Sequence, residues 1–547
     1  MHARSDRRRG SRATRTGVLA AGMIVTAGML SPTAYADTAH QGVAQPPAAG
    51  TVTDCAALAG LTVPRIDGHA VAITDAALTP ASATAPGACT VRGTITVTLA
   101  SSSSTIHFET KLPANTWNHQ YVQVGGGGFC GSVPTAGGAG DDALARGFAV
   151  ASDDTGHVGS SGDGSFAYNN PAAELTWGRL SEHLTAKVSK TIVASAYGNP
   201  VQRSYFVGCS TGGRQALVLA QQFPTDFNGI VAGAPALHQN ELATLSQGVR
   251  ELENHDSTGK VILDTAAAAM IKQQVIAQCD GQDGLQDGVI ADPSSCTPDL
   301  DSLLCSTHVG SRCLTQAQID VARKWYDSPR LPSGAELYPG GLPVGSEGGW
   351  PGYDIGTGSG LSGGGNYAQE VLRYLAYPTD PGPSYSLYDF NPATDAARLH
   401  TMDSVYNADS TDMTAFKQAG GKLIMWQGLA DPLITPFGTI RYYNDVVKFD
   451  GGSLANTQKW FRSYFLPGVY HCTGGPGPSS VDWLGAISDW VGQGQQPERL
   501  VATTAGDRGT VTMRRPLYPY PLEARYSGNG GPNVLTSFYA AEGTLGR

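Results

Sequence analysis

Short runs of β-branched and aromatic residues recur along the chain, and segments of helix-forming composition, such as 174–197 and 213–222, separate them. Strands that alternate with helices predict a parallel α/β sheet covered on both faces. Residues 37–110 differ, because stretches such as 93–99 alternate polar and apolar positions and predict an antiparallel edge of that sheet. The runs that predict the parallel strands are 121–124, 148–152, 203–207, 227–235, 422–426 and the start of 464–472.

The alternation of strands and helices stops after residue 235 and resumes near residue 422. We therefore interpret residues 236–405 as an inserted lid domain. The body is then divided into a first part, 37–235, and a second part, 406–547.

The first 36 residues have the features of a secretory signal peptide: several arginines, an apolar run over 17–30 and an Ala-x-Ala cleavage site at 34–36. No later stretch is long and apolar enough to cross a bilayer, so we expect a secreted protein with no membrane partner. The net charge of −10, with no basic cluster after residue 36, argues against nucleic acid as a partner.

Residues 208–212, Gly-Cys-Ser-Thr-Gly, have the G-x-S-x-G form of a nucleophile elbow and lie between a predicted strand and a predicted helix. A tight turn there lifts the hydroxyl of Ser210 out of the sheet and places the N–H of Thr211 where it can stabilise an oxyanion. Ser210 is the candidate nucleophile, and the alternative is an ordinary turn. We expect a second oxyanion donor from the glycine run 125–128, with Gly127 preferred, although a flexible loop has the same composition.

Asp431 follows the predicted strand 422–426, and His471 follows the next one. The chain order Ser210, Asp431, His471 is that of an α/β-hydrolase triad, so we predict an α/β-hydrolase fold with an inserted lid. Other acids and histidines lack this position at a strand end. Those that remain formal alternatives are Asp403, Asp409, Asp412, His157 and His400.

Nine cysteines follow the signal segment, and in an oxidising compartment most should be paired, with one left over. A bond between Cys209 and Cys472 would hold Ser210 and His471 side by side, because a disulfide keeps Cα atoms roughly 4.4–6.8 Å apart. Two buried thiols are the alternative. Cys130 has no evident partner. The other expected pairs are local: Cys55 with Cys89, Cys279 with Cys296, and Cys305 with Cys313.

The loop after Cys279 contains three aspartates, Asp280, Asp283 and Asp287, within eight residues. Such carboxylates could bind a hard cation, with backbone carbonyls completing the coordination. The spacing is not that of an EF-hand, and a solvated acidic turn explains it equally well.

Gly-Cys-Ser-x-Gly-Gly at 208–213, Asp-Pro at 431–432 and His-Cys-x-Gly-Gly at 471–475 resemble the CS–D–HC signature of the tannase and feruloyl esterase family. The resemblance covers nearly all of the chain after residue 36 and implies a serine esterase that hydrolyses small esters of aromatic, phenolic acids, such as feruloyl or galloyl esters. The roles it implies are Ser210 as nucleophile, His471 as general base, Asp431 as the acid that orients it, and a bond between Cys209 and Cys472. It also implies a structural calcium ion in the lid, bound by Asp280, Asp283, Leu285, Asp287 and Val289.

Several positions depart from that family, among them Thr211 after the serine, where relatives often have an acidic residue. Tyr518 and Tyr539 stand where relatives have a cysteine pair in the C-terminal tail, and Gln427 stands where the family's hydrolases of terephthalate monoesters have a histidine. Hydrolysis of terephthalate-type monoesters is therefore the second prediction, and a non-catalytic secreted binding protein is a more remote third. Trp350 and Tyr353 are the most obvious lid aromatics, and packing within the lid is the favoured interpretation of both.

Overall fold

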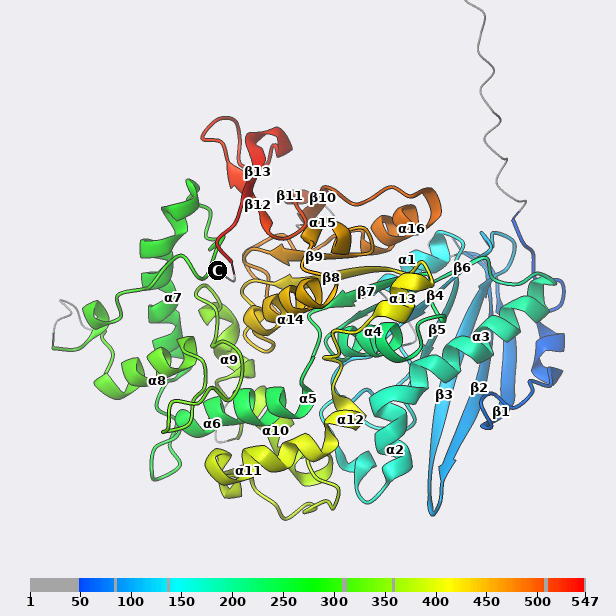
Figure 1. Cartoon of the computed structure of the whole chain (residues 1–547), viewed down its shortest axis with the longest axis horizontal. Helices are drawn as coiled ribbons and strands as arrows, with labels where there is room; N and C mark the ends of the chain where they lie inside the picture. Colours follow the sequence, from blue (N-terminus) through cyan, green and yellow to red (C-terminus); the bar gives the residue numbers. More distant parts are fainter. Residues whose placement is uncertain are drawn as a thin grey trace, which may run out of the picture. The chain divides into compact units, whose positions relative to one another are not determined.

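The sheet at the centre of the fold has nine strands among the residues described (Figure 1), in the order β1-β2-β3-β5-β4-β6-β7-β8-β9. Its neighbours from β5 to β9 are parallel, and β1, β2, β3 and β5 pair antiparallel, as the alternating pattern of 93–99 predicts. The strands are β1 Ala70–Thr79, β2 Ala88–Leu99, β3 Ser102–Pro113, β4 Gln120–Val124, β5 Ala149–Asp153, β6 Arg203–Cys209, β7 Gly229–Gly233, β8 Lys422–Gly428 and β9 Phe461–Leu466. The computed structural model describes residues 49–82, 86–134, 138–306, 312–356, 360–505 and 510–545, so the predicted signal peptide lies outside it.

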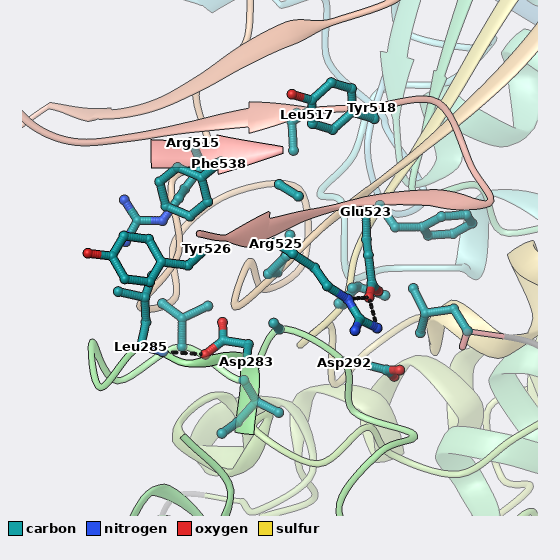
Figure 2. A pocket seen from close by; sticks show the side chains of 18 of the residues that line it. Asp283, Leu285, Asp292, Arg515, Leu517, Tyr518, Glu523, Arg525, Tyr526 and Phe538 are labelled. Atoms are coloured by element: carbon teal, nitrogen blue, oxygen red, sulfur yellow. Dashed lines mark hydrogen bonds and ion pairs between the residues drawn. The ribbon is translucent and has the colours of Figure 1, made fainter. Parts of the chain in front are cut away.

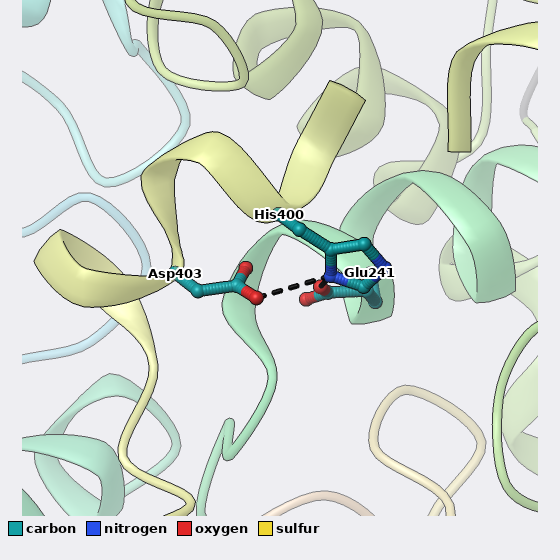
Figure 3. Close-up of side chains that lie close together, drawn as sticks. All are labelled: Glu241, His400 and Asp403. Atoms are coloured by element: carbon teal, nitrogen blue, oxygen red, sulfur yellow. Dashed lines mark hydrogen bonds and ion pairs between the residues drawn. The ribbon is translucent and has the colours of Figure 1, made fainter. Parts of the chain in front are cut away.

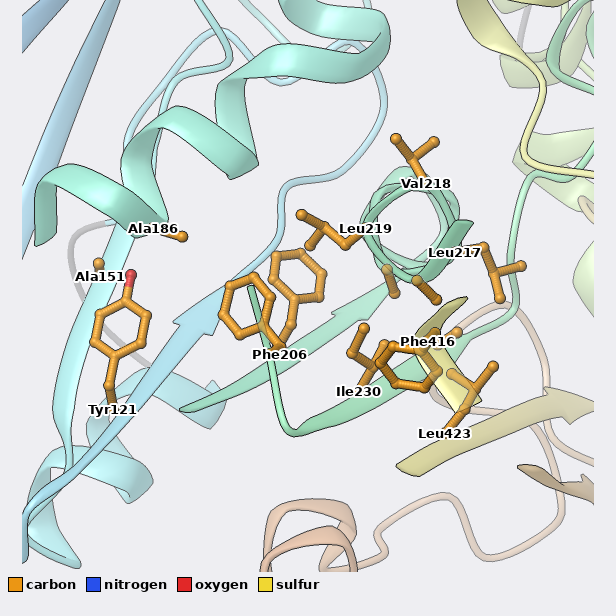
Figure 4. Close-up of a cluster of buried hydrophobic side chains, with 14 of the residues drawn as sticks. Tyr121, Ala151, Ala186, Phe206, Leu217, Val218, Leu219, Ile230, Phe416 and Leu423 are labelled. Atoms are coloured by element: carbon orange, nitrogen blue, oxygen red, sulfur yellow. The ribbon is translucent and has the colours of Figure 1, made fainter. Parts of the chain in front are cut away.

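Both faces of the parallel strands are buried, because successive side chains point to opposite faces and each face has its own apolar cluster. Phe206 and Ile230 belong to the cluster shown in Figure 4, where they lie against Leu217 and Leu219 of α4. Their chain neighbours Tyr205 and Val231 belong to the opposite cluster. The first face is covered by α3 Ser181–Tyr197, α4 Thr211–Gln222 and α14 Pro436–Phe449, and the second by α1 Gly138–Ala145 and α16 Trp483–Gln493.

The predicted single helix 174–197 is divided in three. It consists of α2 Pro171–Leu175, a π-helical turn Thr176–Leu180, and α3. At the centre of the π turn, a Cβ on Gly178 would lie 2.5 Å from the carbonyl oxygen of Val405. The turn therefore brings the backbone close to the segment that returns from the insertion to the sheet.

The insertion between β7 and β8 is helical and has one apolar cluster of its own, and a second cluster joins it to body residues such as Phe129 and Trp177. None of the helices in the described ranges is both long and apolar enough to span a membrane. The helices between β7 and β8 are α5 Gln239–Glu241, a π-helical segment Leu242–Gly248, α6 Val249–Glu253, α7 Thr265–Cys279, α8 Gln316–Tyr326, α9 Trp350–Tyr353, α10 Gly363–Tyr374, α11 Pro392–Leu399, α12 Asp403–Tyr406 and α13 Thr414–Gln418.

The C-terminal tail after α16 forms two small antiparallel pairs, β10 Leu500–Ala505 with β11 Val511–Leu517, and β12 Leu522–Tyr526 with β13 Phe538–Glu542. A further short helix, α15 Leu454–Thr457, precedes β9. The tail lies near α7 of the insertion (Figure 1), and Arg515 of β11 forms an ion pair with Asp287 in the loop that follows α7.

Two buried carboxyl groups, Asp153 at the end of β5 and Glu182 in α3, interact on the first face of the sheet. Burial, reinforced by the nearby Asp154 carboxylate, raises the pKa of Asp153 from 3.8 to about 7. Burial and the charge of Asp153 also raise the pKa of Glu182. Both groups hold protons more tightly in the folded protein than in the unfolded chain.

We expect Asp153→Asn to flatten the dependence of stability on pH. Between pH 3.8 and about 7 the folded protein keeps a proton on Asp153 that the unfolded chain has released, so stability falls as pH rises through this window. An amide removes that contribution. Urea denaturation midpoints at several pH values measure it, with the exposed Asp320→Asn as control. If Asp153→Asn and the parent protein had identical profiles of stability against pH, Asp153 would not be the source of the pH dependence.

Candidate active site

Ser210 occupies the turn between β6 and α4 in an unusual backbone conformation, with φ 66° and ψ −121°. A non-glycine residue with positive φ is strained, and such strain persists where the surrounding structure holds it. The turn is tight: a Cβ on Gly208 would lie 2.5 Å from the carbonyl oxygen of Gly212, and one on Gly213 would lie 2.1 Å from that of Gly233. The glycines of the motif therefore make the elbow possible.

A continuous hydrogen-bond chain links Ser210, His471 and Asp431. The Nε2 atom of His471 lies 2.9 Å from the Oγ of Ser210, and its Nδ1 lies 2.8 Å from Oδ2 of Asp431. The side chain of Asp431 is fully buried, and that of His471 is 9 % exposed. Of the acids and histidines considered from the sequence, the structure brings these two to the elbow serine.

Four donors surround the Asp431 carboxylate. Its Oδ1 accepts hydrogen bonds from the N–H groups of Leu433 and Ile434, at 2.9 and 3.0 Å. Its Oδ2 accepts from Nε2 of Gln427 at 2.8 Å, besides facing His471. Gln427 is completely buried, and its Nε2 also donates to the carbonyl of Ile434. Gln427 thus positions the acid, a role the sequence did not reveal.

The cysteines beside the serine and the histidine are bonded to each other. Cys209 and Cys472 form a disulfide with Cα atoms 6.0 Å apart, which ties the end of β6 to the loop after β9. The pairs Cys55–Cys89, Cys279–Cys296 and Cys305–Cys313 are also present, as expected. Cys130 is free and buried, and burial raises the pKa of its thiol to about 12.

The other acids and histidines lie away from this chain. The His157 ring stacks on Phe166 with centroids 3.7 Å apart. Asp412 accepts a hydrogen bond from the N–H of Thr414 at the start of α13. The remaining alternatives are engaged elsewhere: His400 with Asp403, and Asp409 with His238.

The glycine run lies on the first turn of α4. The N–H of Gly126 donates to Gln215, its carbonyl accepts from the N–H of Gly212, and the hydroxyl of Thr211 donates to the carbonyl of Gly128. The backbone N–H of Gly126 is thus engaged. Those of Thr211 and Gly127 have no acceptor among the residues described, which leaves both able to bind an oxyanion.

The insertion contributes one aromatic ring at the histidine. Tyr353 of α9 lies edge-on to His471 with ring centroids 6.3 Å apart, and it is 37 % exposed. Trp350 instead is fully buried and packs against Trp325, as the packing interpretation expects. The approach of this segment depends on glycine, because a Cβ on Gly348 would lie 2.3 Å from the hydroxyl of Tyr470.

The acidic loop after α7 carries the residues predicted to bind calcium. Burial raises the pKa of Asp280 and of Asp283, and the Asp287 carboxylate adds to both shifts. This oxygen-rich set suits a hard cation, which would relieve the repulsion between the carboxylates. The three side chains do not bring one oxygen each to within 4.8 Å of both others in the described structure, and Arg515 pairs with Asp287. The donor chemistry suits calcium, whereas in this arrangement Arg515 is the cation that pairs with Asp287.

A cavity of about 450 Å³ lies between this loop and the tail (Figure 2). Asp283 and Leu285 form one wall, and Arg515 and Phe538 lie across from them. Ser210, Asp431 and His471 do not line it, so this cavity is separate from the serine elbow. Tyr518 and Tyr539 also line it.

Comparison with known proteins supports the same conclusion. The model of a family described as "Tannase and feruloyl esterase" matches residues 89–541. The chain belongs to this family. It is 33 % identical over 504 residues to an uncharacterized esterase of Xanthomonas campestris pv. campestris, covering 84 % of this chain and 85 % of that protein. It is 30 % identical over 538 residues to the mono(2-hydroxyethyl) terephthalate hydrolase of Piscinibacter sakaiensis, and the match covers 85 % of this chain and 87 % of that protein.

The fold of this tannase and feruloyl esterase family member is that of a solved relative. The crystal structure of feruloyl esterase B from Aspergillus oryzae matches with a TM-score of 0.78 and 25 % identity, covering 89 % of this chain and all of the other. The protein is thus an α/β-hydrolase and a carboxylic ester hydrolase, as its family and fold establish.

Replacing both Cys209 and Cys472 by alanine is expected to lower kcat by about 100-fold while the protein stays folded, because small displacements of catalytic groups are costly. The chain-entropy model limits the loss of stability for this 263-residue separation to about 5.6 kcal/mol. Ester hydrolysis and circular dichroism measure the two effects. The control is Cys305→Ala with Cys313→Ala, which opens a separation of 8 residues in the insertion and should leave kcat unchanged. Equal kcat values in both double variants would contradict a positioning role for the Cys209–Cys472 bond.

Proposed function

We propose that this protein is a secreted serine esterase that hydrolyses esters of aromatic, phenolic acids through a Ser210–His471–Asp431 triad. The observation that carries the proposal is the hydrogen-bond chain from Ser210 through His471 to a fully buried Asp431, with distances of 2.9 and 2.8 Å. Secretion is supported by the predicted signal peptide and by disulfides, which persist in oxidising compartments.

The reaction follows from the positions of these groups. The Oγ of Ser210 attacks the ester carbonyl while Nε2 of His471 accepts its proton, and Asp431 stabilises the resulting imidazolium. The N–H groups of Thr211 and Gly127 stabilise the oxyanion of the tetrahedral intermediate. The C–O bond then breaks, the imidazolium protonates the leaving alcohol, and an acyl-serine remains. Water, deprotonated by His471, attacks this ester and releases the carboxylic acid and free Ser210.

Esters of phenolic acids are the favoured substrates because the family model and the feruloyl esterase structure both match over most of the chain. Tyr353 at His471 offers an aromatic surface for such an acid. A terephthalate monoester is the second candidate, since one relative is a mono(2-hydroxyethyl) terephthalate hydrolase. Gln427 does not exclude it, because this side chain is buried behind Asp431.

A panel of purified esters distinguishes these possibilities. We expect higher kcat/KM for methyl ferulate, methyl gallate or methyl 4-hydroxybenzoate than for mono(2-hydroxyethyl) terephthalate, with p-nitrophenyl acetate as a reference for intrinsic triad activity. The opposite order would favour the second candidate. Failure to hydrolyse any ester, together with no labelling by a fluorophosphonate, would indicate a binding protein.

We also propose that the acidic loop after α7 binds one structural calcium ion. Asp280, Asp283 and Asp287, with the carbonyls of Leu285 and Val289, would hold it. Bound calcium would neutralise the loop carboxylates and stabilise the segment between Cys279 and Cys296. Acyl transfer at Ser210 needs no metal.

Removing calcium should therefore reduce stability more than catalysis. We expect a chelator to lower the melting temperature by several degrees. Losing the ion should cost roughly 1–3 kcal/mol of the free energy of unfolding, and each kcal/mol shifts the melting temperature of a large domain by about 2–4 °C. Initial rates of ester hydrolysis, measured at temperatures well below the melting temperature, should change little. Asp283→Asn should melt at the same temperature with and without chelator. Elemental analysis that finds no calcium in protein purified without chelator would refute the site.

A further inference from the structure

A second cluster of potential metal ligands lies where the insertion leaves and re-enters the body. Glu241 is the last residue of α5, soon after β7, whereas His400 and Asp403 begin the short helical segments that precede the return to β8. Figure 3 shows the three side chains facing one another. Within the described residues, this is the group of acids and histidines whose ligand atoms all lie within 4.8 Å of one another.

The geometry of this cluster matches a compact coordination sphere. The Nδ1 atom of His400 lies 3.1 Å from Oε1 of Glu241 and 3.0 Å from Oδ2 of Asp403. One nitrogen thus faces two carboxylates at once. Ligand atoms of a tetrahedral zinc ion, bound at roughly 2.0–2.1 Å, lie about 3.3 Å apart, close to the two distances from His400, and the two carboxylate oxygens lie within 4.8 Å of each other.

An unsatisfied buried carboxylate supplies independent support. Glu241 is only 7 % exposed, its carboxylate points into the cluster, and its Oε2 atom has no hydrogen-bond partner. Oδ1 of Asp403 is also buried without a partner. No lysine or arginine in the described structure forms an ion pair with either acid. A buried carboxylate is costly unless a cation or hydrogen bonds compensate for its lost hydration.

We propose that Glu241, His400 and Asp403 bind a zinc ion that fastens the base of the insertion. One imidazole and two carboxylates suit zinc, whereas calcium and magnesium prefer oxygen ligands alone. The His400 side chain is 62 % exposed, which leaves room for a water molecule as the fourth ligand.

The ion would join two segments that are distant in sequence but paired in space. Just beyond the cluster, the N–H of Ala408 donates to the carbonyl of Leu237 at 2.9 Å. Arg214 of α4 donates to the carbonyl of Tyr406 at 3.3 Å, so the return segment also contacts the elbow helix. Because these ligands come together only in the folded protein, the ion binds the folded state and not the unfolded chain, and its binding free energy adds to stability. The site is structural and takes no part in ester hydrolysis.

Zinc binding to the full-length, calcium-loaded protein tests the proposal. Competition with a chromogenic zinc chelator should give one bound equivalent, and zinc should raise the melting temperature. His400→Ala should weaken binding by more than about tenfold, since changes even to outer-shell partners of metal ligands cost 10- to 100-fold. It should also abolish the increase in melting temperature. Asp403→Asn should act in the same direction, and it retains the side-chain shape if His400→Ala perturbs the fold.

His183 provides a matched control. Its ring also contacts two carboxylates, but each contact uses a different ring nitrogen: Nδ1 faces Asp226 and Nε2 faces Asp67. The two acids therefore cannot share one ion with a single ring nitrogen, and His183→Gln should leave zinc binding unchanged. The proposal would be overturned if the parent protein bound no zinc at micromolar concentrations. It would also be overturned if His400→Ala and Asp403→Asn bound zinc as the parent does, which would leave His400 as a direct polar link between the two acids.

Discussion

Ser210→Ala is expected to abolish ester hydrolysis, lowering kcat by about four to six orders of magnitude, as for the nucleophile of other Ser–His–Asp enzymes. The substitution removes the atom that attacks the carbonyl and leaves His471 without a proton to accept. The fold should persist, because alanine has no hydroxyl to bury and the glycines around the elbow are unchanged. Hydrolysis of p-nitrophenyl acetate and of methyl ferulate measures the loss.

The control for Ser210 is Ser463→Ala. Ser463 lies on β9, is fully buried and has no hydrogen-bond partner for its hydroxyl, so this variant removes a serine from the same sheet without touching the triad. It should keep full activity and label with a fluorophosphonate, whereas Ser210→Ala should not label. If Ser210→Ala kept an activity within tenfold of the parent, or if that variant were labelled, Ser210 would be excluded as the nucleophile.

Asp431→Asn is expected to lower kcat by about 10⁴-fold, the effect of the same change in a serine protease triad. All four groups around this carboxylate are donors in the active state: two N–H groups at Oδ1, and Gln427 and His471 at Oδ2. The backbone pair must keep an oxygen, so the asparagine NH₂ would face Gln427 and His471. His471 would then expose Nδ1 as an acceptor and carry its proton on Nε2, where it cannot accept the proton of Ser210.

Asp412→Asn is the matched control, because Asp412 is an exposed acid that the sequence left as an alternative and that interacts only near the start of α13. Its kcat should equal that of the parent. Circular dichroism should show both variants folded. If Asp431→Asn retained more than about a tenth of the parent kcat, the tautomer argument would fail and another acid would have to orient His471.

The sequence predicted the parts of this protein that depend on local patterns. The strands before and after Ser210 show as short apolar runs, because a parallel strand is buried on both faces whatever its neighbours are. The order of Ser210, Asp431 and His471 was visible because each residue lies at the end of such a run. The antiparallel edge was equally predictable from the alternation over 93–99, which lies within β2.

Contacts between distant segments could not be predicted in this way. Gln427 was noted only as a substitution, since its contact with Asp431 depends on the turn after β8. The break at 176–180 brings Gly178 close to Val405, more than 200 residues later in the chain, and the local pattern carries no sign of that contact. The cluster of Glu241, His400 and Asp403 forms only when the two ends of the insertion meet, and His400 and Asp403 entered the sequence argument only as rivals for the triad.

The bond between Cys209 and Cys472 has a consequence for the integrity of the enzyme after proteolysis. Ser210 and His471 are separated by the whole insertion in sequence, yet they are flanked by two halves of one cystine. A protease that cuts the backbone anywhere between Ser210 and His471 produces two fragments, one with the nucleophile and one with its base. The fragments remain one covalent molecule, which separates on a gel only after reduction. Serine and histidine therefore stay joined after such a cut, so cleavage within the insertion does not by itself dissociate the triad.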